Sequence, residues 1–171
     1  DYVELGTRKE LIYDFGMYED KLHISEGYGI SRLEDGLVLT LKPPTKTYCI
    51  MEYANTLLIG GEDGIFVPGK RLYSRPEMIT HSMVVHNNVL YDSSSEGVYV
   101  TTTGDKVSNR LYTSLCSYGR KLYGGTSDGI YDVLYDTKLY GRPGFVRSLC
   151  IHEQELYDIG DYPNIYKTLK S

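Results

Sequence analysis

The stretch Leu122-Tyr123-Gly124-Gly125-Thr126-Ser127-Asp128-Gly129-Ile130-Tyr131 decides the fold, because close copies of it recur along the chain. The clearest copies begin at Leu57 and Leu90, a fainter one begins at Leu22, and a fifth begins at Leu156 with one extra residue. The five lead leucines are spaced by 35, 33, 32 and 34 residues. Five repeats therefore account for nearly the whole chain, and a period of roughly 20–50 residues is typical of solenoids and propellers.

Each copy predicts a β-hairpin. The Leu-Tyr-like run is one strand, the acidic residue and glycine form the turn, and the Ile-Tyr-like run is the return strand, because glycine supplies the positive φ of a tight turn. A further strand precedes each hairpin, at Tyr13 to Tyr18, Tyr48 to Tyr53, His81 to His86, Thr113 to Tyr118 and Arg147 to His152. A weaker fourth strand follows the first four, at Leu37 to Leu41, Arg71 to Ser74, Lys106 to Ser108 and Lys138 to Tyr140.

The preceding strands, here called inner strands, carry neighbouring apolar residues such as Leu149 and Cys150. Adjacent residues of a strand point to opposite faces, so we expect both faces of every inner strand to be buried. Composition agrees with an all-β chain: tyrosine and glycine each occur 18 times, and alanine occurs once, at Ala54. Tyrosine favours pleated sheets, and no long stretch has the spacing of an amphipathic helix.

Four-stranded repeats that stack face to face around an axis form a β-propeller. The sequence predicts a single five-bladed domain over 1–171, with blades at approximately 9–41, 42–74, 75–107, 108–140 and 141–171. Residues 1–8, with a strand from Tyr2 to Leu5, would complete the last blade and close the ring, which removes an exposed sheet edge. The competing prediction is an open β-solenoid, whose repeats are usually shorter and need polar caps.

The recurring Leu-x-x-Gly-Gly-x-x-Gly-Ile-Tyr phrase resembles the short propeller repeats of the two-component-regulator type. It is more loosely similar to kelch and quinoprotein-like repeats. The resemblance covers all five copies and implies a propeller fold. Propellers of this kind serve as sensors, scaffolds, lectins and enzymes, so the resemblance alone leaves the activity open.

Candidate binding residues gather where one predicted blade leads into the next. A basic residue precedes proline at Lys42, Arg75 and Arg142, and the inner strands begin at Tyr13, Tyr48, His81, Thr113 and Arg147. In a propeller these residues share one loop face around the channel mouth. The basic residues among them would form a cationic surface for a small anionic ligand or an acidic partner segment. Alternatively, proline stiffens the connection and each arginine pairs with a turn carboxylate such as Asp128.

The sequence favours a non-catalytic protein without a metal or cofactor. It has no phosphate-binding glycine loop, nucleophile elbow or zinc motif, although Asp14 and Glu52 could form a carboxylate pair. We therefore expect a scaffold that binds an unknown protein or a small anionic ligand. The alternatives are a lectin with one shallow glycan site per blade, or a hydrolase with its site at the channel mouth.

Charge and cysteine usage predict the compartment and exclude some partners. The net charge of −5 argues against a nucleic-acid binder, and no apolar run approaches the roughly 20 residues of a membrane span. The sequence does not open with a basic segment followed by an apolar one, so we expect no secretory signal in it. Cys49, Cys116 and Cys150 lie in apolar strand-like runs. We expect three buried free thiols and a reducing, cytoplasmic location.

Overall fold

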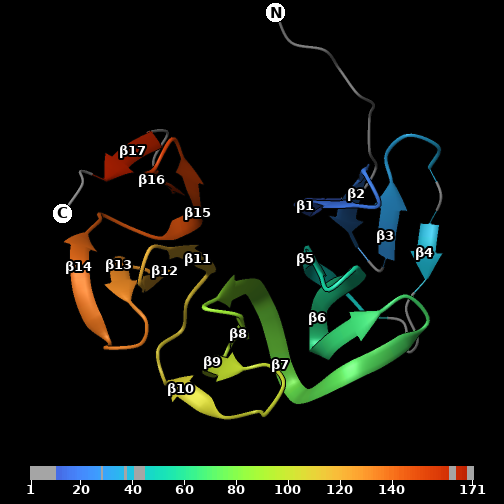
Figure 1. Cartoon of the computed structure of the whole chain (residues 1–171), viewed down its shortest axis with the longest axis horizontal. Coiled ribbons are helices and arrows are strands. Elements are labelled where there is room, and N and C mark those ends of the chain that lie inside the picture. Colours follow the sequence, from blue (N-terminus) through green and yellow to red (C-terminus); the bar gives the residue numbers. More distant parts are fainter. Residues whose placement is uncertain (1–10, 28, 37, 41–44, 162–164, 169–171) are drawn as a thin grey trace, which may run out of the picture. The chain divides into compact units, whose positions relative to one another are not determined.

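The computed structural model describes residues 11–27, 29–36, 38–40, 45–161 and 165–168, which form β-strands and no α-helix (Figure 1). The chain divides into two compact units, Asp1–Thr80 and His81–Ser171. Each unit is described here by itself. The predicted strand from Tyr2 to Leu5 and the candidate residue Lys42 lie outside the described residues.

Unit 1 contains two antiparallel groups of strands. The first is a four-stranded sheet in chain order, made of β1(Ile12–Tyr18), β2(Lys21–Glu26), β3(Gly29–Arg32) and β4(Val38–Thr40). The second joins β5(Thr47–Tyr53), β6(Thr56–Val67) and the first part of β7(Lys70–His86). These strands coincide with the first two predicted repeats, which confirms their antiparallel strand order.

Unit 2 continues the pattern over three further groups of strands. The end of β7 pairs with β8(Val89–Ser94), followed by β9(Gly97–Val100) and β10(Lys106–Ser108). A four-stranded sheet comprises β11(Ser114–Tyr118), β12(Lys121–Gly125), β13(Gly129–Asp132) and β14(Thr137–Gly141). The last sheet has β15(Val146–His152), β16(Glu155–Gly160) and β17(Ile165–Thr168), so three strands of the fifth repeat lie among the described residues.

The connection at Arg75-Pro76 differs from its prediction. We expected a loop there, but both residues lie inside β7, which joins the outer strand of the second repeat directly to the inner strand of the third. Glu77 has a φ of +61°, and its N–H donates to Oδ1 of Asp63 at 2.9 Å. The backbone therefore changes direction inside a continuous strand instead of leaving the sheet.

The glycine that ends each acidic turn is required by a close approach of the outer strand. Gly64, Gly97 and Gly129 have φ values of +143°, +134° and +154°. A Cβ atom at these three positions would lie 2.1 Å from the carbonyl oxygens of Tyr73, Ser108 and Tyr140, respectively. Only a residue without a side chain fits at these three positions, which is why the second, third and fourth repeats keep glycine there.

Consecutive repeats pack closely through shared apolar clusters. Ile30 of the first repeat joins Ile50, Leu57, Ile59 and Phe66 of the second, and comparable clusters link the third with the fourth repeat and the fourth with the fifth. A Cβ atom on Gly60 would lie 2.8 Å from Cγ2 of Thr80, and one on Gly125 would lie 2.7 Å from Cγ1 of Val146. The small residue three positions after the lead leucine thus receives the start of the next inner strand.

Burial of both faces of every inner strand was predicted, and this is wrong for β1 and β15. Phe15 and Met17 are 58% and 54% exposed, because β1 packs on β5 through the face that carries Asp14 and Gly16. In β15, Leu149 is buried whereas Cys150 is exposed. The prediction of three buried thiols is wrong for the same reason: all three cysteines are free, but only Cys49 is buried and Cys116 is half-buried.

Candidate binding surface at the start of the inner strands

A β-bulge lies at the start of three inner strands, at the positions singled out from the sequence. Tyr13 is the extra residue between Ile12 and Asp14, which face Glu26 and Ser25. Tyr48 and Arg147 occupy the same place in β5 and β15. Thr113 occupies a similar place before β11. Its N–H and its hydroxyl both donate to the carbonyl of Gly125, the residue that pairs with Ser114. Because a bulge re-aims a side chain out of the regular ladder, it is a common device next to binding sites.

The two bulge tyrosines of unit 1 lie against each other. The ring centroids of Tyr13 and Tyr48 are 5.2 Å apart, and the ring planes are inclined by 65°. The hydroxyl of Tyr48 donates to Oε1 of Glu62 at 3.2 Å, and Nζ of Lys46 lies 3.8 Å from the same oxygen. Tyr13, Tyr48, Lys46 and Glu62, here called the tyrosine site, thus combine aromatic rings with one carboxylate and one ammonium group.

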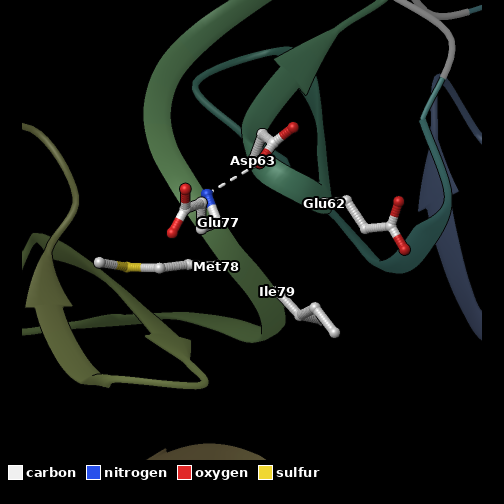
Figure 2. Close-up of a pocket in the computed structure, with 5 residues that line it drawn as sticks. All are labelled: Glu62, Asp63, Glu77, Met78 and Ile79. Atoms are coloured by element: carbon white, nitrogen blue, oxygen red, sulfur yellow. Dashed lines mark hydrogen bonds between the residues drawn. The ribbon is translucent and has the colours of Figure 1, made fainter.

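Glu62 also lines a shallow pocket of about 250 Å³ together with Asp63, Glu77, Met78 and Ile79. Figure 2 shows Asp63 bound to the backbone of Glu77, while the Glu62 side chain points away from Glu77. The three carboxylates therefore do not converge on one point. Among the described residues, no group of three His, Cys, Asp or Glu side chains has an arrangement suited to a metal ion.

Arg147, the bulge residue of β15, forms an exposed ion pair. Its Nε donates to Oδ1 of Asp161 at 2.7 Å, and its guanidinium lies 5.1 Å from the centroid of the Phe145 ring. The side chain is 61% exposed. Arg147 remains accessible to a ligand at the start of its strand, although Asp161 already accepts one of its hydrogen bonds.

Arg142 is engaged inside unit 2. Its Nε donates to Oδ1 of Asp158 at 2.9 Å and its Nη2 donates to Oδ2 at 2.7 Å, while the Asp158 side chain is only 1% exposed. The hydrogen bond to Asp158 raises the pKa of Arg142. The partner is a strand carboxylate and not a turn carboxylate, and this bidentate pair occupies much of the guanidinium.

The remaining predicted residues are less accessible. Arg75 is buried and donates from Nη1 to the carbonyl of Ser74 at 3.2 Å. His81 is half-buried, and that burial lowers the pKa of its imidazole. Tyr13 and Tyr48 thus lie in contact with each other, and Arg147 lies in unit 2 near the start of its own strand.

Sequence reasoning missed a contact that recurs between strands. A cation lies over the aromatic residue nine or ten positions after the lead leucine: Arg71 over Phe66, Lys106 over Tyr99, Lys138 over Tyr131 and Arg142 over Tyr166, at 5.4, 5.7, 5.8 and 4.9 Å. In the first three repeats of this set the cation belongs to the following outer strand. The recurring basic residue after the aromatic was the available signal, and it indicates a structural clamp.

Asp14, considered as one half of a catalytic pair, has a structural contact. Its Oδ2 accepts the backbone N–H of Ile50 at 2.9 Å, which ties the first repeat to the second. Burial raises the pKa of Asp14, and the hydrogen bonds from Ile50 and Phe15 partly offset that rise. A carboxylate that already holds the backbone of the next strand is poorly placed for proton transfer.

The sequence matches no protein-family model and no curated protein. The fold is similar to the extracellular domain of BT4673 from B. thetaiotaomicron, described as a one-component system, with a TM-score of 0.68 and 16% identity over 92% of this chain and 27% of that chain. Sqt1 of Saccharomyces cerevisiae has a TM-score of 0.57 and 11% identity over 89% of this chain and 56% of that one. The computationally designed Ika8 protein also has a TM-score of 0.57, with 13% identity over 87% and 55%.

The chain thus spans between about a quarter and just over half the length of these structures. Its neighbours are propeller-like, and at such identities the likeness concerns the fold alone. Together with the strand order, it identifies an all-β protein built from antiparallel sheets. No helix within the described part of the chain has the length and apolar character needed to cross a membrane.

Proposed function

We propose that the chain is a non-catalytic, five-bladed propeller that binds a protein or a small anionic ligand through the loop face where its inner strands begin. The observation that carries the proposal is the repeated bulge at Tyr13, Tyr48 and Arg147. The frame around each bulge is uniform, whereas the bulge residues differ in size and charge. A constant frame with varied residues at one end of each strand is the arrangement of a recognition surface.

Ring closure is part of this proposal, and the repeat pattern supports it. Inside the units, the residue three positions after a lead leucine meets the first residue of the next inner strand, as Ser25 does with Thr47 through a 2.9 Å hydrogen bond. The corresponding residues at the two ends of the pattern are Ile159 and Ile12, which are large, apolar and 45% and 40% exposed. We propose that these two side chains cover each other, with residues 1–8 completing the last blade.

A cross-link tests closure. Ile12→Cys and Ile159→Cys, combined in a Cys150→Ser background and treated with a mild oxidant at low protein concentration, should form a disulfide within one chain and give a monomeric product with changed electrophoretic mobility. A matched pair, Ile12→Cys with Tyr135→Cys, places the second thiol in the turn between β13 and β14 and should not form a disulfide. Cross-linked dimers as the main product would instead assign the two faces to neighbouring copies and overturn closure.

The binding proposal is tested by reversing a charge at each end of an inner strand. The full chain is immobilised, recovered proteins are identified, and each is measured again against Arg147→Glu and Arg120→Glu. Both residues are exposed, but Arg147 is the second residue of β15 whereas Arg120 follows the far end of β11. Binding that falls with Arg147→Glu and survives Arg120→Glu supports the loop face. The reverse pattern, or equal loss, places the site elsewhere.

The small-ligand form of the proposal has its own measurement. Inorganic phosphate and citrate should raise the melting temperature of the wild-type chain and have a smaller effect on Arg147→Glu, since a ligand that binds the folded state stabilises it. An equal rise in both proteins would show that Arg147 is not part of the site.

We also propose a cytoplasmic location, because all three thiols are free.

A further inference from the structure

We infer that the tyrosine site of unit 1 is a carbohydrate-binding subsite that takes a neutral sugar ring, with one such subsite in the chain. The inference goes beyond the proposed binding of a protein or a small anionic ligand, because it adds a neutral ligand class at another part of the loop face. It differs from a lectin with a site in every repeat. The equivalent bulge positions hold His81, Thr113 and Arg147, which provide no second tyrosine pair.

The aromatic part of the subsite is held in place by its surroundings. Thr47 and Cys49, on either side of Tyr48, are buried, so the backbone that carries the ring is fixed. The Tyr13 ring packs against the Tyr48 ring with the two centroids 5.2 Å apart, and Tyr13 is itself 43% exposed. An exposed ring that is already ordered loses little conformational freedom when a ligand covers it, which favours binding of the apolar C–H face of a pyranose.

The polar part supplies both kinds of hydrogen-bonding group. Glu62 is held by the hydroxyl of Tyr48 at 3.2 Å and by Lys46 at 3.8 Å, and its side chain remains 40% exposed. A carboxylate accepts from the hydroxyls of a sugar, and an ammonium group donates to them. Such a small number of fixed polar groups beside an aromatic surface is typical of sites that orient small ligands.

The surrounding charge selects among sugars. Lys46 and Glu62 offset each other, whereas the adjoining pocket adds the carboxylates of Asp63 and Glu77. Asp63 has one distant cation, Nη2 of Arg71 at 4.0 Å. An anionic sugar that extended from the tyrosine site into this pocket would meet like charge, so uronic acids should be rejected. A neutral sugar would meet hydrogen-bond acceptors there without that repulsion.

Affinity electrophoresis of the full chain tests the inference. Native gels are cast with hydroxyethyl cellulose, with galactomannan, with polygalacturonate or without polysaccharide. We expect retardation in at least one neutral gel and none in polygalacturonate. Tyr13→Ala should weaken the apparent affinity by about tenfold or more, whereas Tyr13→Phe, which keeps the ring, should stay within about threefold of wild type.

Tyr135→Ala is the matched control, because Tyr135 is a 79% exposed tyrosine in unit 2 and its loss should change nothing. Titration of an oligosaccharide from the retarding polymer should give one site per chain. Failure of every neutral gel, unchanged retardation of Tyr13→Ala, or about five sites per chain would overturn the inference. Partner binding that depends on Arg147 would be unaffected by any of those results, so the proposed function is judged separately.

Discussion

Arg142 and Asp158 form a buried, bidentate ion pair in unit 2, with Nε–Oδ1 and Nη2–Oδ2 distances of 2.9 and 2.7 Å. Asp158 lies on β16, between the apolar positions of the fifth repeat, and Arg142 reaches it from the connection after β14. The same guanidinium covers the ring of Tyr166 on β17. Arg142 therefore does for the fifth repeat what an outer-strand cation does for the second, third and fourth.

Arg142→Ala should destabilise the protein strongly, because it leaves Asp158 buried without its partner. Removal of one member of a buried ion pair costs roughly 3–5 kcal/mol. Arg147→Ala is the control: its pair with Asp161 is exposed, and such pairs contribute roughly 0–1 kcal/mol. Urea unfolding of the two variants measures the difference. Equal midpoints would show that the Arg142–Asp158 pair adds nothing beyond a surface contact.

The three thiols should react in the order of their exposure. Cys150 is exposed and should react fastest with Ellman's reagent in the native protein at pH 8. Burial, together with the nearby Cys150, raises the pKa of Cys116 to about 11, so little of it is thiolate at that pH. Cys49 is buried and should wait for unfolding. Native labelling of Cys116 as fast as Cys150, checked with Cys150→Ser, would contradict this order.

The repeat register was predictable because it follows from close contacts that recur. The motif glycine lies against a carbonyl oxygen in three repeats, and the small residue three positions after the lead leucine contacts the next inner strand, so both contacts leave a recognisable residue in most copies. Asp158 had no such mark. The matching position holds another buried aspartate, Asp92, in the third repeat, but Ile24, Ile59 and Gly124 in the first, second and fourth, so no residue type shared by most copies indicated a buried carboxylate.

The tyrosine site was only half predictable. Tyr13 and Tyr48 were recognised as equivalent strand starts, but their contact depends on bulges, which shift the register by one residue and leave no trace in hydrophobic alternation. Arg75 shows the opposite limit. The Arg-Pro pair predicts a loop, yet both residues lie within the long strand β7, where Glu77 adopts a positive φ.

Gly129→Ala should disrupt the fourth repeat. Its φ is +154°, and the new Cβ would lie 2.1 Å from the carbonyl oxygen of Tyr140, so β13 and β14 would have to separate. We expect a loss of about 2 kcal/mol or more, in the range of a strained backbone position. Gly141→Ala is the control, since its Cβ would meet only Cε of Lys138, at 3.9 Å. Similar melting temperatures for both variants would refute the role of this close approach.

Ala54→Gly should stabilise the second repeat. Ala54 and Asn55 form the tight turn between β5 and β6 with φ values of +49° and +57°, and the left-handed region costs alanine roughly 1–2 kcal/mol. Glycine removes that cost, although its greater loss of backbone entropy on folding offsets roughly 0.5–1 kcal/mol of it, so the net gain should be about 1.5 kcal/mol or less. Ala54→Val is the opposite probe and should be destabilising. A gain with valine, measured by thermal unfolding, would contradict the observed turn.

Asp14 should make the protein less stable as pH rises above the ordinary range of a carboxyl group. Burial raises the pKa of Asp14 in the folded state, so the folded protein binds a proton over a pH window in which the unfolded chain has lost it. Stability is therefore highest below the ordinary pKa of 3.8 and falls until the raised pKa has been passed. Asp14→Asn keeps an oxygen for the N–H of Ile50 but cannot ionise, and should abolish this fall.

Asp128 changes stability with pH in the opposite direction. The hydrogen bond from Lys138 lowers the pKa of Asp128 to about 2, so its small contribution to stability, weakened by solvent, is lost between about pH 4 and 2. Urea unfolding of wild type and Asp14→Asn from pH 4 to 7 separates the two groups, since Asp128 is ionised in both states across most of that range. Parallel curves for the two proteins would show that Asp14 is not the group that titrates.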